Sequence, residues 1–82
     1  MSKRIDRIPK RFRSQVERQL KTLSQLIQEQ RQALGLTQER MAETLDVSVE
    51  SIKLIESGRG RPSLPMLFHI CAVLKIEVEF KV

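Results

Sequence analysis

Two short helical patterns in tandem constrain the fold of this 82-residue chain more than any other feature of its sequence. The first covers residues 38–45, the second covers residues 49–56, and a three-residue turn separates them. Thr37 and Ser48 stand directly before the two patterns. Their hydroxyl groups suit the N-cap position, where a side-chain oxygen accepts a hydrogen bond from a free backbone N–H. We therefore expect an all-α fold built around this pair of helices.

Further helical patterns flank the pair on both sides. From Phe12 onward, apolar residues recur every three or four positions, which predicts a helix over residues 12–34. Its expected weak point, where it could break, is Thr22–Ser24. Gly35 follows where a helix end favours a residue that tolerates positive φ. After a loop over residues 57–62, Ser63 is expected to cap a fourth helix that carries a proline in its first turn.

The last seven residues change period. Apolar and charged residues alternate over residues 76–82, which predicts a half-buried β-strand. No other segment of the sequence has a strand pattern, so pairing with the same strand of a second copy would satisfy its backbone. A pair centred on Glu79 sets Glu77 against Lys81, whereas a pair centred on Phe80 brings the two phenyl rings together. Charge matching does not separate these registers, and a strand that folds back on its own helices or frays is the alternative.

The positive charge of the chain is concentrated near its beginning. The net charge is +5, and residues 1–13 account for all of it because they contain six basic side chains and one acidic one. Three interpretations of this basic N-terminal arm stay open. It is a solubilising tail, a segment that lies along DNA phosphates or enters a minor groove, or a segment that docks onto protein through its apolar residues.

Residues 23–76 resemble the lambda-repressor-like (XRE-type) helix-turn-helix family. The features that carry the resemblance are Arg31, the run Gly35–Ser48, Ile52, the run Ile55–Gly58 and the run Pro62–Leu64. The resemblance implies a DNA-binding bundle in which the second helix of the pair enters the major groove. The pair alone is also compatible with a generic small helical bundle. A β-strand at the end of such a domain further resembles the HipB-like antitoxin group, whose members dimerise through paired C-terminal strands.

The resemblance also assigns roles to individual residues. Ala42 matches the small residue that lets the two helices cross closely, and Val47 matches the buried residue of the turn. Gln38 matches a glutamine that bonds phosphate and braces the recognition helix, although a simple exposed helix start is the alternative. Arg31 and Glu56 match an ion pair that ties the first helix to the recognition helix.

The recognition helix and the loop after it supply the expected DNA contacts. Val49 and Leu54 would press on thymine methyl groups. Glu50 would accept from a cytosine amino group, or would be an ordinary surface residue because phosphates repel a carboxylate. Lys53 would reach guanine or phosphate. The expected DNA-binding residues are Gln38, Ser48, Val49, Glu50, Ser51, Lys53, Leu54, Arg59 and Arg61.

The sequence has no constellation typical of an enzyme, and a single cysteine (Cys71) and a single histidine (His69) do not make a metal site. No cofactor is expected. The absence of a signal peptide or a long apolar run predicts a soluble, cytoplasmic protein without a membrane partner.

These features predict three parts: the arm over residues 1–13, a helix-turn-helix domain over residues 14–75, and a dimerisation strand over residues 76–82. The expected function is a homodimeric transcriptional repressor that binds a palindromic operator on double-stranded DNA. The alternative is an antitoxin that neutralises a toxin protein and regulates its own operon.

Overall fold

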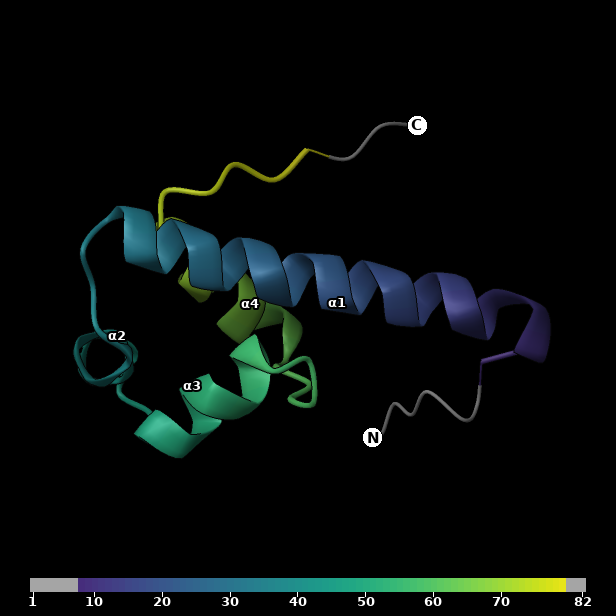
Figure 1. The fold of residues 1–82 in the computed structure, drawn as a ribbon, viewed down its shortest axis with the longest axis horizontal. Helices are drawn as coiled ribbons and strands as arrows, with labels where there is room; N and C mark the ends of the chain where they lie inside the picture. Colours follow the sequence, from purple (N-terminus) through teal and green to yellow (C-terminus); the bar gives the residue numbers. More distant parts are fainter. Residues whose placement is uncertain (1–7, 80–82) are drawn as a thin grey trace.

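The computed structural model describes residues 8–79, and four α-helices account for most of them (Figure 1). One long helix runs along the molecule, and three short helices lie on one side of its C-terminal half. None of the helices over residues 8–79 combines the length and the apolar character needed to cross a membrane. The helices are α1 (Lys10–Ala33), α2 (Gln38–Leu45), α3 (Val49–Glu56) and α4 (Leu64–Val73).

Helix α1 is continuous, which confirms the predicted single helix, and the possible break near Thr22–Ser24 does not occur. Ser24 is buried, and its hydroxyl lies 3.7 Å from the position that a Cβ on Gly58 would occupy. The chain after α3 therefore packs onto this turn of α1 and favours its helical form. Because α1 begins at Lys10, the last four residues of the expected arm are helical. Residues 1–7 of the arm lie outside the described part of the chain.

Capping hydroxyls set the starts of α2 and α3, and both helices have the predicted bounds. The hydroxyl of Thr37 accepts from the N–H of Arg40 at 3.0 Å, and that of Ser48 accepts from the N–H of Ser51 at 3.1 Å. Between the two helices, Asp46 has φ of 58°, in the left-handed region. Aspartate tolerates this conformation better than most residues, so one residue is enough to end α2 and turn the chain.

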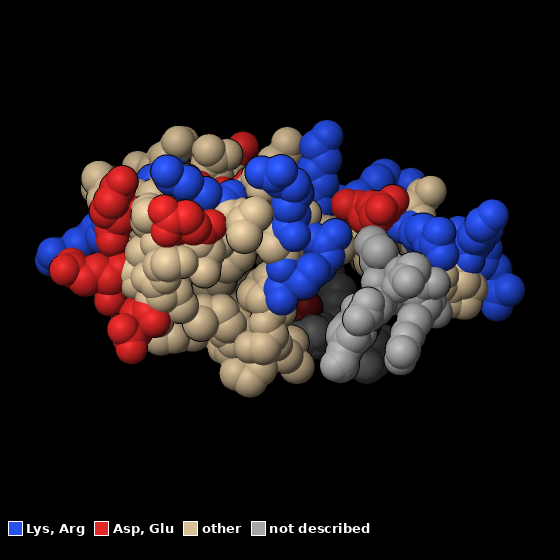
Figure 2. Space-filling view, turned by 90° about the horizontal axis from the view of Figure 1, so that it is seen from below, with Lys and Arg blue, Asp and Glu red and all other residues tan. Residues whose placement is uncertain are grey.

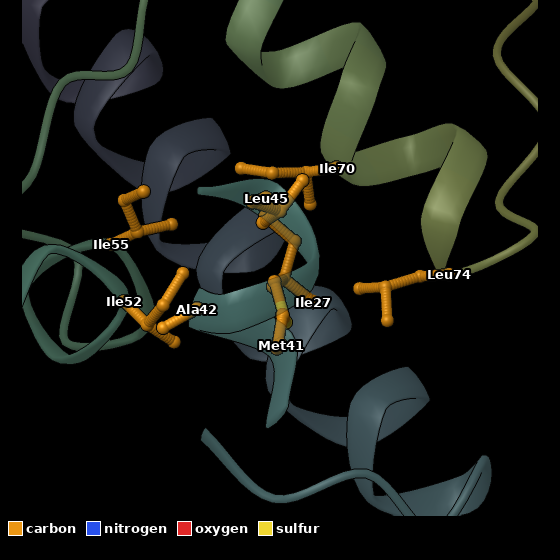
Figure 3. Packing of buried hydrophobic residues seen from close by; sticks show 8 residues of the cluster. All are labelled: Ile27, Met41, Ala42, Leu45, Ile52, Ile55, Ile70 and Leu74. Atoms are coloured by element: carbon orange, nitrogen blue, oxygen red, sulfur yellow. The ribbon is translucent and has the colours of Figure 1, made fainter. Parts of the chain in front are cut away.

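A single apolar cluster holds the four helices together (Figure 3). Each helix contributes at least one side chain to it, and α2 contributes three. Burying one such side chain stabilises the fold by about 1.5–3 kcal/mol, so the short helices depend on this cluster. The members are Ile27 of α1, Met41, Ala42 and Leu45 of α2, Ile52 and Ile55 of α3, and Ile70 and Leu74 at the end of α4.

Helix α4 is apolar on its outer side as well as on the side that faces the cluster. Ser63 caps it by accepting from the N–H of Met66 at 3.2 Å. On its outer side, Leu64 is 62% exposed and Phe68 is 40% exposed. Cys71 is buried, and burial raises the pKa of its thiol above the ordinary value.

The predicted C-terminal strand is not present in residues 76–79, and the described part of the chain is all-helical. A strand needs a hydrogen-bonded neighbour, and residues 8–79 of one copy provide no other strand. The segment instead continues from the end of α4. Lys75 has φ of 60°, the N–H of Ile76 donates to the Cys71 carbonyl at 2.8 Å, and the Ile76 side chain packs against the core. Residues 80–82 of the predicted strand lie outside the described residues.

Candidate nucleic-acid interface

Helix α3 has one exposed face and one face held by the core. Glu50, Lys53 and Leu54 are exposed, and Ser51 is half-buried. A leucine that is 44% exposed in the middle of a short helix leaves an apolar contact surface next to two charged side chains. These three residue types match the contacts that base edges offer in a major groove.

Val49 differs from the expectation that it faces outward. It is half-buried and packs against the core cluster. The helical period explains this placement, because Val49, Ile52 and Glu56 are three and four residues apart and share one face of α3. Since Ile52 is fully buried, the same face of α3 places Val49 against the core cluster.

Two serines lie at the start of α3, the exposed N-cap Ser48 and the half-buried Ser51. The Ser48 hydroxyl accepts from the backbone N–H of Ser51, and the two hydroxyl oxygens are 3.0 Å apart. Their hydrogen bonds therefore fix the first turn of the helix. An exposed hydroxyl keeps further capacity to donate or accept, so Ser48 is available to an external group as well.

A buried ion pair fixes the orientation of α3 relative to α1. The Arg31 Nε donates to Glu56 Oε2 at 2.6 Å, and its Nη2 donates to Oε1 at 3.1 Å. The two side chains are only 8% and 3% exposed. Arg31 Nη1 also donates to the Leu36 carbonyl at 2.7 Å, so the guanidinium group binds α3 and the loop after α1 at the same time. The ion pair implied by the family resemblance is thus present.

Gln38 joins this network from the start of α2. Its Nε2 donates to Glu56 Oε1 at 3.1 Å, which links the first residue of α2 to the last residue of α3. The side chain is half-buried. The family resemblance implies two roles for this glutamine, binding phosphate and bracing the recognition helix. The hydrogen bond to Glu56 corresponds to the bracing role.

The loop after α3 carries Arg59 and Arg61, and both are exposed. Arg61 Nη1 donates to the carbonyls of Gly58 and Gly60 at 2.7 and 3.0 Å. A Cβ on Gly60 would approach the backbone nitrogen of Ile55 to 2.9 Å, which is closer than real Cβ atoms come. The glycine therefore lets the loop lie directly against α3 and places both guanidinium groups beside it.

A shallow hollow of about 250 Å³ lies between α3, this loop and the start of α4. Ser51, Leu54 and Arg61 are among the residues that line it. The structure thus brings two expected contact residues of α3 and one of the loop to the edge of the same depression.

The comparisons with known proteins agree with this geometry. The family model described as Helix-turn-helix matches residues 27–81, about two thirds of the chain. The chain belongs to the helix-turn-helix family. No solved structure matches it.

Three curated relatives are similar to the helix-turn-helix part of this chain. An uncharacterised HTH-type transcriptional regulator of Methanothermobacter thermautotrophicus is 45% identical over 49 residues, covering 60% of this chain and 71% of the relative. The cryptic phage CTXphi transcriptional repressor RstR of Vibrio cholerae is 38% identical over 50 residues, covering 61% and 45% of the two chains. An uncharacterised HTH-type transcriptional regulator of Archaeoglobus fulgidus is 36% identical over 53 residues, covering 65% and 76%.

Charge is distributed unevenly over this helix-turn-helix protein. Residues 34–56, which contain α2 and α3, have two basic and five acidic side chains, whereas α1 has six basic and two acidic ones. Figure 2 shows acidic side chains at the end of the molecule where α2 and the start of α3 lie. Basic side chains also lie in the middle of the same face and at the end formed by the N-terminal half of α1, with one acidic group between them.

Arg18 and Lys21 belong to this basic part of α1, and the sequence reasoning did not single them out. Both are exposed. The net charge of residues 14–82 is zero, which is why the sequence alone assigns all the excess positive charge to residues 1–13. This sum hides the positive charge of α1 and the negative charge of α2 and α3. Counting charge element by element would have drawn attention to both residues.

Proposed function

We propose that this chain is a DNA-binding transcriptional regulator whose α3 enters the major groove. The observation that carries the proposal is the two-sided character of α3. One face is fixed by Ile52, Ile55 and the Arg31–Glu56 ion pair, and the other exposes Glu50, Lys53 and Leu54. A rigid helix with an exposed contact face is what direct readout of bases requires. The similarity to proteins named as transcriptional regulators and as a repressor supports it.

The exposed face of α3 would read bases, and the loop after it would hold phosphates. Leu54 suits a thymine methyl group, Glu50 suits a cytosine amino group, and Lys53 suits guanine or phosphate. Arg59 and Arg61 suit phosphate oxygens on the flank of the groove, because guanidinium groups bind them with paired N–H donors. Gln38, Ser48 and Ser51, all at the starts of α2 and α3, would add positioning contacts.

We further propose that two copies bind a palindromic operator and repress transcription by covering a promoter. Two recognition helices must then lie about 34 Å apart, one turn of DNA. Pairing of residues 76–82 between two copies would supply the dimer contact. This is supported by the alternating sequence of the segment and by Val78, which is 44% exposed in one copy. Deletion of residues 76–82 is expected to give monomers in sedimentation, and an intact dimer would contradict the strand proposal.

Selection of bound fragments from genomic or random DNA tests the main proposal. The expected result is a recurrent palindromic sequence that outcompetes bulk DNA at moderate ionic strength. Leu54→Ala should reduce that preference, since the shorter side chain would no longer reach a thymine methyl group and a mismatched base pair in a site costs about 1–3 kcal/mol. Binding without preference for any sequence would contradict the proposal.

An antitoxin that binds a toxin protein is the second candidate function. The exposed apolar side of α4 favours it, because Leu64 and Phe68 are large apolar side chains in contact with solvent. A protein that co-purifies with the chain at high salt, and is lost with Phe68→Ser, would support this role. The two functions are compatible, since a repressor can also sequester a partner.

A further inference from the structure

We infer that the N-terminal half of α1 (residues 10–23) is a second DNA-contacting element, which binds phosphates beyond the stretch that α3 reads. The inference rests on the proposed DNA binding, but it concerns a different part of the molecule. It assigns a function to the exposed basic side chains of this half, which take no part in the core; only Leu23, at its end, packs against the core cluster.

The charge of the helix pair favours such an element. Phosphate contacts by basic side chains supply most of the sequence-independent affinity of a DNA-binding protein. Residues 34–56 have an excess of three acidic side chains, and one of them, Glu56, is compensated by Arg31 of α1. The groove-facing side of α3 itself carries Glu50. Most of the positive charge available to DNA therefore lies outside α2 and α3, on Arg59 and Arg61 of the loop and on the basic side chains of α1.

The basic half of α1 offers that charge next to the loop after α3. Lys21 is one turn before Ser24, and Ser24 lies against Gly58, the neighbour of Arg59. Lys10 and Lys21 are eleven residues apart, close to three helical turns, and so share one side of α1. In Figure 2 the basic side chains in the middle of the molecule and those at the end formed by this half of α1 lie on the same face, with one acidic group between them.

Packing against the core does not account for the exposed basic side chains of this half of the helix, although Leu23 at its end contacts the core cluster. The buried residues of α1 are Ser24, Ile27 and Arg31, all in its C-terminal half. The first turn contains no acidic side chain and begins without a capping side chain. Basic residues at that end oppose the helix dipole and weaken the helix, a disadvantage that a bound polyanion would reverse.

The geometry also sets the reach of the contact. Lys10 and Lys21 are about 16 Å apart along the axis at 1.5 Å per residue. At about 3.4 Å per base pair, this length corresponds to about five base pairs of duplex. Each protomer would therefore contact phosphates along about five base pairs more than a protein whose first helix began near Ser24.

A salt titration with the full chain tests the inference without knowledge of the operator. We would measure binding to a random-sequence duplex over a range of salt concentrations for the wild type and for a variant with Lys10→Gln, Arg18→Gln and Lys21→Gln. Arg11 is left unchanged because its guanidinium group stacks on Phe12, at 4.8 Å from the ring centroid. The slope of log K against log salt should become shallower by about 0.9 for each phosphate that the variant no longer neutralises.

Two further variants control for the loss of charge and for misfolding. Lys75→Gln removes an exposed charge just after α4 and should leave the slope unchanged. Glu17→Gln removes the acidic residue within this half of α1 and should strengthen binding, which a damaged fold would not do.

The outcomes separate this inference from the proposed function. If the triple variant keeps the wild-type slope and Glu17→Gln does not strengthen binding, the α1 contact is refuted, while sequence preference sensitive to Leu54→Ala would still support the regulator. If the slope falls as expected but no sequence is preferred, the α1 contact stands and the regulator proposal fails. Shortening an operator duplex by about five base pairs at each end should weaken the wild type more than the triple variant.

Discussion

The two halves of α1 belong to one unbroken helix but differ in what holds them. The C-terminal half buries Ser24, Ile27 and Arg31 against the other helices, whereas the N-terminal half buries none of its side chains. Local backbone hydrogen bonds make the helix continuous, but tertiary packing provides most of its stability. The comparison teaches that burial against the other helices holds the C-terminal half of α1, whereas the N-terminal half touches the core only through Leu23 and exposes most of its charged side chains.

Arginine illustrates the difference most clearly. Arg31 is buried and makes hydrogen bonds to Glu56 and to the Leu36 carbonyl, while Arg18, less than four turns earlier, is exposed. An arginine thus holds two helices together in one half of α1, and an arginine in the other half is an exposed surface charge. Substitutions of the same residue type in the two halves should therefore have different effects.

Arg31→Ala should have the largest effect. It leaves the Glu56 carboxylate buried without its ionic partner, and breaking a buried pair in this way costs about 3–5 kcal/mol. Arg18→Ala should change the free energy of unfolding by less than about 0.5 kcal/mol, as at other surface sites. Chemical denaturation followed by circular dichroism measures both.

Equal losses in the two variants would contradict the division of α1 into two halves. Arg31→Met combined with Glu56→Leu sharpens the test. Replacing both charges by apolar groups of similar size should recover much of the stability that Arg31→Ala loses, because no charge is then stranded.

Much of the fold could be predicted from the sequence because the signals for α2 and α3 are local. Thr37 and Ser48 are N-caps, Asp46 and Gly35 have positive φ where a turn was expected, and the apolar spacing gives the core faces. The apolar spacing predicted one helix over residues 12–34, but the sequence left a break at Thr22–Ser24 open, because the contact of Ser24 with Gly58 involves a segment far along the chain.

The predicted C-terminal strand is a pattern in the sequence that did not translate into structure within one copy. The alternation over residues 76–82 is real in the sequence, but a strand forms only when another strand pairs with it. Within one copy, the Ile76 side chain instead packs against the core, and its N–H donates to the Cys71 carbonyl at the end of α4.

Parts of the site were predictable for a different reason. The family resemblance gave Arg31, Glu56 and Gln38, and the structure brings these three side chains together. The inward turn of Val49 follows from the helical period and could have been predicted. The placement of basic side chains along one face of α1 and the loop after α3 could not, because it depends on how distant elements pack.

Replacing a serine by leucine in each half of α1 should give the next largest difference in stability. Ser24→Leu would force three additional carbon atoms into a packed contact with the turn at Gly58, and such overpacking costs about 1–3 kcal/mol. Ser14→Leu, in the exposed half of the same helix, should change stability by less than about 0.5 kcal/mol. Thermal unfolding of the two variants compares them directly. A destabilisation by Ser14→Leu as large as that by Ser24→Leu would mean that the N-terminal half is packed after all.

A substitution at the start of α1 should have the smallest effect on stability. It tests whether a gain in stability in one half of α1 reaches the other half. Pro9 occupies the N-cap position with a non-helical backbone but has no side-chain acceptor, unlike Thr37, Ser48 and Ser63. Pro9→Ser supplies that acceptor and should stabilise the first turns by about 0.5–1 kcal/mol. Because residues 10–22 have no fully buried side chain and no contact with the core cluster to transmit the gain, amide hydrogen exchange should slow by up to about fivefold near residues 12–20 and stay unchanged near residues 27–33. If protection rises equally along the whole of α1, the helix opens as one unit, and its charged half is coupled to the core.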